Sequence, residues 1–439
     1  MVSNTHKAIA AWSLEQAIKQ GCQEARVILY EGSDTEFEVR NEQLDRLQQS
    51  TEHQLIFHVY VDGRYGSFST NRLVKGELGP FIRDAVEAVR FLAPDPHRQL
   101  PDPKRYFTGQ GADLALFDAG IDRLHPDTKL DLARAATMEV FGQDKRVLSV
   151  QANWNDGASN NYLLTSNGFE GDQSVSYYAL SVTVSVKGRG DARPEAFWYD
   201  QALNYEDLIK QGIGKEALSR ALAKIGQRKV ASGRYTVVVD PQNSIRLLSP
   251  LLSALSGAAL QQNNSFLREK LGVKLFSDNM TLIDDPHVPK AFGSRWFDNE
   301  GVATIKRPVI NKGVVETYFL DTYHASKMGL APTISGPSRL VLAPGANNCE
   351  GMVSSLEKGL LITGFNGGNC NSSSGDFSFG IEGFLIENGQ CTQPLSEMNM
   401  TGNMLELWRQ VAEVGNDPRR NNAYQIPSLR FEEVTVSGE

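Results

Sequence analysis

Residues 174–187 begin SVSYYALSVTVSV and alternate with a period close to two. Successive side chains of a β-strand point to opposite faces of its sheet, so this pattern predicts a long strand with one face of Ser and Thr. Residues 54–61 alternate in the same way, and Asp62-Gly63 after them is typical of a tight hairpin into a strand at 65–70. The chain is therefore expected to build at least one antiparallel sheet.

The remaining hydrophobic patterns predict a mixture of helices and strands. Helices are predicted at 13–19, 78–92, 127–141, 216–226, 244–260, 265–271 and 321–328. Strands are predicted at 26–30, 35–40, 147–153, 161–166, 196–199, 235–239, 281–283, 302–305, 314–319, 338–342, 359–363 and 428–438, with a turn at 31–34. Because strands and helices do not alternate regularly, we expect an α+β fold of two mixed α/β halves with largely antiparallel sheets.

A chain of 439 residues is too long for one ordinary core, so two domains are expected. Residues 93–120 are rich in Pro, Asp and Gly and are predicted to be a connecting loop. The small residues Ala231-Ser232-Gly233 mark the predicted boundary. This divides the chain into an N-terminal α+β domain, 1–230, and a C-terminal β-rich domain, 231–439.

The composition of the chain argues against nucleic acids and membranes as partners. The chain is 41% hydrophobic and 22% charged, as soluble globular proteins are, and its net charge of −8 includes no long basic run. We therefore expect no direct nucleic-acid binding. No segment approaches 18 apolar residues and the first twenty do not resemble a signal peptide, so no membrane partner is expected. The four cysteines form no CxxC pair, which indicates free thiols and a cytoplasmic protein.

The stretch from Leu361 to Gly389 reads LITGFNGGNCNSSSGDFSFGIEGFLIENG. Its seven glycines are interleaved with apolar residues, so it is not a disordered linker. One interpretation is an ordered segment that another strand or a bound peptide approaches closely. The other is a Gly-rich turn followed by a strand and a hairpin at Glu387-Asn388-Gly389.

Motifs for self-contained chemistry are absent from the sequence. It holds no GxGxxG at a strand-to-helix junction, no GxxxxGK[ST] and no GxSxG. No two of its seven histidines lie within one helical turn of each other, whereas zinc sites normally use close-spaced ligands. Asp284-Asp285-Pro286-His287 could supply metal ligands but is more typical of a turn. A Cys370–His324 pair is conceivable, although nothing in the sequence places the two together.

The Gly-rich stretch also carries a resemblance. Its segment GGNCNSSSGDFSFGIEGFLIENG is similar to the C-terminal signature of the TldD/PmbA family, on the PmbA (TldE) side. Further matches are Asp62-Gly63-Arg64 with Gly66, Leu255-Ser256-Gly257, Ser265-Phe266-Leu267, 282–286, 297–301 and 426–429. The resemblance implies a cytoplasmic peptidase complex that acts on unfolded or extended peptides. An older label for the family is modulator of DNA gyrase.

In that family the TldD-type subunit carries zinc through an HExxxH helix and a later cysteine, and a partner of similar fold lacks these ligands. Aligned on Ser256-Gly257, the box falls here on residues 248–253, which read LSPLLS. Neither histidine is present, nor is the glutamate, and a serine hydroxyl does not replace an imidazole as a zinc ligand. No cysteine stands near Gly415-Asn416-Asp417-Pro418 or after it. Pro250 is expected near the start of an ordinary helix.

The resemblance thus implies a metal-free, PmbA/TldE-like subunit that is inactive alone, without catalytic residues, metal ligands or a cofactor of its own. We expect zinc in a TldD-type partner, with which the chain would form a heterodimer. Pairing with a second copy of itself, as a homodimer, is the alternative. An extended peptide would pair with the Gly-rich strand. The residues expected to contact it are Asn369, Asn371, Gly375, Asp376, Phe377 and Phe379. Two alternatives stay open, a non-proteolytic regulator of a topoisomerase and an independent peptidase with an unrecognised site.

Overall fold

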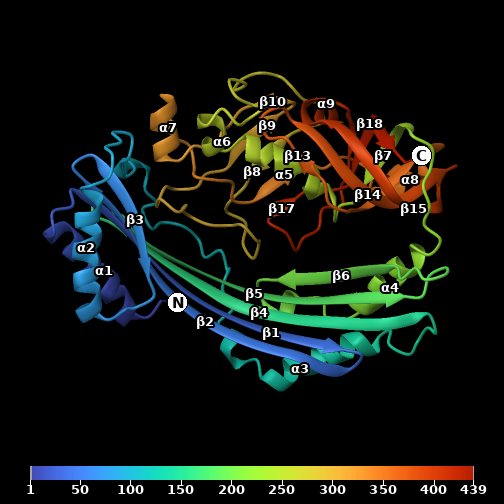
Figure 1. Cartoon of the computed structure of the whole chain (residues 1–439), viewed down its shortest axis with the longest axis horizontal. Coiled ribbons are helices and arrows are strands. Elements are labelled where there is room, and N and C mark those ends of the chain that lie inside the picture. The colour runs from blue at the N-terminus through green and yellow to red at the C-terminus, as the bar shows by residue number, and fades with distance from the viewer. Residues whose placement is uncertain (1, 439) are drawn as a thin grey trace.

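The computed structural model describes residues 2–438, which form two halves stacked on each other (Figure 1). A long curved sheet, blue to green in Figure 1, makes up most of the N-terminal half. The C-terminal half, yellow to red, lies over one face of that sheet. The expected mixture of helices and largely antiparallel sheets is confirmed.

The N-terminal sheet is antiparallel throughout, in the order β3-β2-β1-β4-β5-β6. Its strands are β1 (Glu24–Arg40), β2 (Gln43–Val61), β3 (Arg64–Thr70), β4 (Val147–Thr165), β5 (Glu170–Val186) and β6 (Glu195–Ala202). The alternation that predicted β5 is present, since every second residue from Tyr178 to Val186 is buried. The Asp62-Gly63 hairpin between β2 and β3 is also present.

The predicted turn at 31–34 is wrong, because β1 runs straight through it. Asp34 pairs with Ser50 of β2 on one side and with Gly157 of β4 on the other. A Cβ at Gly157 would lie 2.5 Å from Asp34 Oδ1, so glycine there permits the close approach of two strands. The predicted strands 147–153 and 161–166 are likewise one continuous strand, β4.

Four helices cover one face of this sheet. They are α1 (Asn4–Lys19), α2 (Lys75–Val89), α3 (Pro126–Met138) and α4 (Ile213–Ala223). Helices α1 and α2 pack at one end of the sheet, around Val27 and Leu29, and α3 and α4 pack at the other end, around Phe37 and Val39 (Figure 1). These four β1 residues share a face because they are separated by even numbers of positions. Glu31 lies between the two cores on that same face.

The connection 93–120 contains one short 3₁₀ helix, Pro103–Arg105, and is otherwise irregular, as predicted. It crosses to the C-terminal half, where Tyr106 forms an isolated bridge with Val302. Tyr106, Phe169 and Phe297 make a small aromatic core between the halves. This contact seats the C-terminal half on the sheet.

The C-terminal half contains a closed ring of strands. Its strands are β7 (Gly233–Val239), β12 (Lys358–Phe365), β14 (Asp376–Glu387), β15 (Gln390–Asn403) and β18 (Leu429–Ser437). The pairing runs β12-β7-β18-β15-β14 and returns from β14 to β12, so no member of the ring is an edge strand along its whole length. The expected hairpin at 387–389 joins β14 to β15, with Asn388 at φ 50° and Gly389 at φ 75°.

Shorter elements surround the ring. Strand β13 (Asn369–Cys370) continues along β14, and β16 (Val411–Val414) pairs with β18. A second sheet, β10-β9-β8-β11-β17, is formed by β8 (Leu282–Asp284), β9 (Arg307–Asn311), β10 (Val314–Val315), β11 (Leu340–Leu342) and β17 (Tyr424–Gln425). The helices are α5 (Ser244–Ala254), α6 (Gly257–Gln261), α7 (Thr322–Met328), α8 (Cys349–Ser354) and α9 (Met404–Arg409).

Several predicted C-terminal elements differ from the structure. The helix predicted at 244–260 is two helices, because Ser256 has extended backbone angles and caps α6 by accepting the N–H of Ala259. The segment 265–271 forms turns rather than a helix, and 302–305 makes only isolated bridges. Within residues 2–438, no helix combines the length and the apolar character needed to span a membrane.

Candidate functional site

The candidate site is a groove that follows helix α5. Three adjoining hollows compose it, and neighbouring hollows share lining residues. We call it the α5 groove. One wall is made by Gln242, Asn243, Arg246, Ser249 and Ser253, and the other by residues 363–370 at the end of β12, the following turn and β13. It runs from the cleft between the two halves to the Gly-rich stretch singled out in the sequence.

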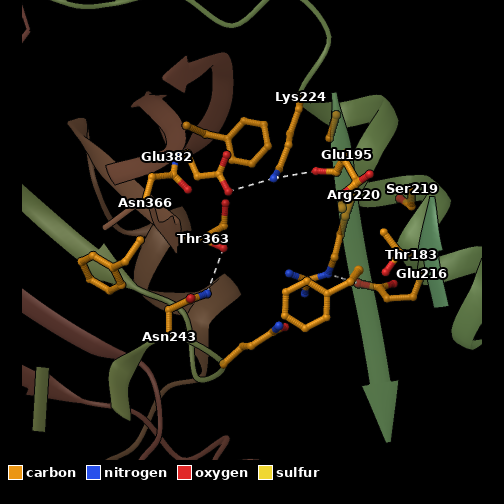
Figure 2. Close-up of a pocket in the computed structure, with 17 residues that line it drawn as sticks. Thr183, Glu195, Glu216, Ser219, Arg220, Lys224, Asn243, Thr363, Asn366 and Glu382 are labelled. Carbon is orange, nitrogen blue, oxygen red and sulfur yellow. Dashed lines mark hydrogen bonds and ion pairs between the residues drawn. The ribbon is translucent and has the colours of Figure 1, made fainter. Parts of the chain in front are cut away.

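The first hollow is a cleft of about 460 Å³ between the halves. Figure 2 shows Lys224 reaching from α4 toward Glu382 of β14; its Nζ lies 2.8 Å from Glu382 Oε1. The same ammonium donates to the carbonyl of Glu195 in β6 at 2.9 Å. Across the cleft, Asn243 Nδ2 donates to the Thr363 carbonyl at 2.9 Å. The cleft therefore has charged and amide groups at fixed positions on both sides.

Farther along, the groove is lined by α5 and by backbone of the Gly-rich stretch. Arg246 is exposed, donates to the Gly368 carbonyl at 3.1 Å and lies 5.1 Å from the centre of the Phe379 ring. Strand β13 pairs with β14 on one side only, since it stands last in its sheet order. Asn369 and Cys370 of β13 face the same hollow as Ser249 of α5. This is where a further extended segment could pair with β13.

Helix α5 carries the residues aligned with the HExxxH box. Leu248 is fully buried in the core, whereas Ser249 and Ser253 are exposed to the groove. The Ser253 hydroxyl donates to the Ser249 carbonyl at 3.1 Å. Zinc is held in proteins by imidazole, thiolate or carboxylate groups, so this donor set does not fit the metal.

Pro250 lies inside α5 rather than in its first turn, which corrects the expectation from the sequence. Having no N–H, it cannot make the bond to the carbonyl of Arg246 that an ordinary residue would make. Its ring lines the groove between Ser249 and Ser253. A proline therefore occupies the part of the helix where the family's metal box falls.

The structure places the six expected peptide-contacting residues in three surroundings. Asn369 and Phe379 line the α5 groove, although Phe379 is 1% exposed and belongs mainly to the core. Phe377 is also buried and stacks on Phe379 at 5.1 Å. Asn371 lies in the turn beyond β13 and Asp376 begins β14, and both are held by local hydrogen bonds. The groove thus gathers two of the six directly.

The last of the six, Gly375, has a conformational role. Its φ is +83°, which disfavours any residue with a Cβ, and such a Cβ would lie 3.3 Å from the Phe266 ring. Its N–H donates to the Asn371 carbonyl at 2.8 Å and its own carbonyl accepts from Met404 at 2.8 Å. Glycine here closes the turn between β13 and β14.

The other candidates from the sequence are explained by local contacts. His324 Nδ1 lies 2.8 Å from Asp321 Oδ1, at the start of α7. His287 packs against Trp296, with ring centres 4.0 Å apart. Burial and the nearby Asp376 carboxylate raise the pKa of the Cys370 thiol, which makes it a poor nucleophile at neutral pH. All four cysteines are free thiols, as predicted.

Sequence reasoning missed the cleft residues Lys224, Glu382 and Asn243. Lys224 and Glu382 are 158 positions apart, and only the docking of the two halves brings them together. No periodicity or short motif signals such a pair. The one available signal was the Gly-rich stretch from Leu361 to Gly389, which contains Glu382.

Comparison with known proteins assigns the class. Three models of one family match the chain: "PmbA/TldA metallopeptidase domain 1" at residues 25–90, its central domain at 120–225 and its C-terminal domain at 232–438. The chain belongs to the PmbA/TldD metallopeptidase family.

Among individual relatives, the chain is 27% identical to the metalloprotease PmbA of Escherichia coli O157:H7, over 90% of this chain and 88% of that protein. It is 24% identical to a TldD homologue of Buchnera aphidicola, over 71% and 72% of the two chains.

Solved structures agree with these matches. A Bacteroides thetaiotaomicron protein named as a candidate modulator of DNA gyrase is 54% identical, with a TM-score of 0.98 and complete coverage of both chains. TldE from Thermococcus kodakarensis is 21% identical, with a TM-score of 0.85 over 99% of this chain and all of that one. The second likeness shows that the fold is shared.

Proposed function

We propose that this chain is the PmbA/TldE-like subunit of a two-component cytoplasmic metallopeptidase that degrades or processes unfolded peptides. In this proposal the α5 groove holds an extended peptide and a TldD-type partner supplies the zinc. The observation that carries it is the composition of α5. The family's HExxxH motif aligns with residues 248–253 of this helix. Of these residues, Ser249, Pro250 and Ser253 face the groove and Leu248 is buried. None of these can ligate zinc or act as the general base.

Peptide holding is supported by the open side of β13. Asn369 and Cys370 of this strand line the groove, and Arg246 supplies a positive charge beside it. Strand addition uses main-chain hydrogen bonds, so it reads little of the peptide's sequence. That property suits a subunit whose substrates share an extended conformation rather than a motif.

The test compares the isolated chain with a mixture of the chain and a TldD-type partner. An unfolded peptide is supplied to both, with zinc present in both. We expect hydrolysis only in the mixture and a heterodimer by size-exclusion chromatography. Hydrolysis by the isolated chain would overturn the proposal and support an independent peptidase.

A variant tests the groove itself. Asn369→Ala removes an exposed amide from the groove wall, and we expect KM of the complex to rise by about tenfold, the equivalent of one hydrogen bond. Asn311→Ala, an exposed asparagine of β9 that does not line the groove, is the matched control. Equal KM values for the two variants would argue against peptide binding along β13.

A second candidate function comes from the name of the Bacteroides relative, a candidate modulator of DNA gyrase. In this alternative the chain is a non-proteolytic regulator that binds a topoisomerase. The same purification distinguishes it. Stable co-elution with gyrase, together with no hydrolysis in the presence of a TldD-type partner, would favour the regulator over the peptidase subunit.

A further inference from the structure

Three side chains from separate elements converge on the helix-covered face of the N-terminal sheet. His6 comes from α1, Glu31 from β1 and His53 from β2, and their ligand atoms all lie within 4.8 Å of one another. Glu31 Oε1 is the common centre, since it contacts His6 Nδ1 and lies 3.9 Å from His53 Nδ1. In the described part of the chain, this is the one group of three such residues that meets that distance.

The backbone fixes this arrangement. Glu31 is the direct cross-strand partner of His53 on β2 and of Asn160 on β4. Directly opposed residues of adjacent strands have Cβ atoms only about 5 Å apart. His6 lies in the first turn of α1, where its N–H is held by the Ser3 hydroxyl at 3.1 Å. The donors are therefore positioned by a central sheet and a capped helix, not by loops.

Two polar atoms beside Glu31 have no hydrogen-bond partner. Both His53 Nδ1 and Asn160 Oδ1 are buried atoms, and neither forms a hydrogen bond. Buried polar atoms are normally satisfied, because leaving one unpaired costs stability. Each is an atom type that can donate a lone pair to a cation, and each belongs to a residue directly opposite Glu31 on a neighbouring strand. A metal ion bound at Glu31 would give His53 Nδ1 a partner.

We propose that His6, Glu31 and His53 form a binding site for a divalent first-row transition metal, with Zn²⁺ as its representative. Two imidazoles and one carboxylate match that class, whereas Mg²⁺ and Ca²⁺ prefer all-oxygen sites. Asn160, directly opposite Glu31 on β4, has an unpaired side-chain oxygen on the same face of the sheet. All three ligand residues are partly exposed, so an ion can reach them from solvent. The site would join α1 to β1 and β2.

This site is separate from the peptidase site of the proposed function. It lies on the sheet face covered by α1, in the N-terminal half, whereas α5 lies in the C-terminal half (Figure 1). The proposed site departs from the expectation, drawn from the sequence, that the chain has no metal ligands of its own. His6 and His53 are 47 positions apart, which is why spacing in the sequence did not reveal them.

The test is a zinc titration of the full chain, followed with a competing chromophoric chelator. We expect one Zn²⁺ per chain and, in His53→Ala, an affinity weaker by about tenfold or more. Glu31→Gln keeps the shape of the side chain and should weaken the affinity for zinc by a similar factor. His125→Asn is the matched control, because it removes an imidazole beside the single carboxylate of Asp127 and Asn can still cap α3.

Thermal unfolding supplies a second readout that needs neither peptide nor partner. Zinc should raise the Tm of the wild-type chain and of His125→Asn, and should raise that of His53→Ala by less at the same zinc concentration. Circular dichroism of the metal-free variants establishes that they are folded. Wild-type affinity in both folded His53→Ala and Glu31→Gln, or no zinc binding by the wild-type chain, would overturn the site. Either result would leave the proposed peptidase role intact.

Discussion

Asp284 shows how one buried carboxyl organises the second sheet. The residue is 1% exposed, and its Oδ1 accepts the backbone N–H groups of Ser338 and Arg339, each at 3.0 Å. Burial raises the pKa of this carboxyl to about 6, although those two N–H groups and the nearby Arg307 favour the ionised form. The carboxyl hydrogen-bonds the loop before β11 to β8. Ionising it is unfavourable because the charge would be buried away from water.

This raised pKa predicts a pH-dependent stability difference. Between about pH 4 and pH 6 the folded chain binds more protons at Asp284 than the unfolded chain, so its contribution to the unfolding free energy falls as pH rises. Asp284→Asn keeps the accepting oxygen and removes the charge. From pH 4 to pH 7 the free energy of unfolding of the variant should rise by about 2 kcal/mol relative to that of the wild-type protein. Urea denaturation across this range measures the difference, and a constant difference would contradict the prediction.

Some residues of the candidate site can be predicted from a local sequence pattern, and others cannot. Asn369 was found because it lies in an unusual composition, and Ser249 and Ser253 because they align with a recognisable box. The cleft pair Lys224–Glu382 depends on the docking of two halves, and no local pattern encodes that.

At the scale of elements, sequence patterns located most strands but not their continuity. The segment 31–34 contains turn-forming residues, yet it stays extended because β1 is hydrogen-bonded to β2 on one side and to β4 on the other. A strand paired on both sides satisfies its backbone groups along its whole length, and this outweighs local turn preference. At Ser256 the difference is of the opposite kind. Apolar spacing predicted one helix through this position, but Ser256 is extended and its hydroxyl caps the start of a second helix, α6.

Helix α5 offers a prediction about its interior proline. Pro250→Ala restores an N–H for the carbonyl of Arg246 and removes a residue unfavourable inside helices. Part of the gain is offset because proline also restricts the unfolded chain. We expect the unfolding free energy to rise by about 1–2 kcal/mol.

Guanidinium denaturation measures that change, with Ser249→Ala as the control for altering the same groove wall. A loss of stability in Pro250→Ala would mean that the proline ring contributes packing that the helix needs.

At the scale of the whole molecule, polar contacts join the two halves at several places, and one of them crosses the cleft. The Lys224–Glu382 pair has side chains that are 19% and 17% exposed, so it is partly shielded from water. Arg26 of β1 also approaches Glu300 of the C-terminal half at 3.6 Å. These pairs and the small aromatic core make the two halves depend on each other.

Lys224→Met should therefore weaken that dependence. The substitution leaves the partly buried carboxylate of Glu382 without its cation. We expect the free energy of unfolding to fall by about 1–3 kcal/mol. Glu382→Gln and the double variant complete a double-mutant cycle, whose coupling energy should be about 1–2 kcal/mol. Calorimetry should show a broader transition in Lys224→Met. Additive effects of the two substitutions would show that the pair does not couple the halves.

The strand ring of the C-terminal half has a consequence for biosynthesis. Its first strand, β7, is paired with β18, and the partners Val239 and Leu429 are far apart in the sequence. During translation β7 is made long before β18. The ring therefore cannot close until β18 has also left the ribosome. Until then the apolar faces of its strands are exposed, which makes the nascent chain a client for chaperones.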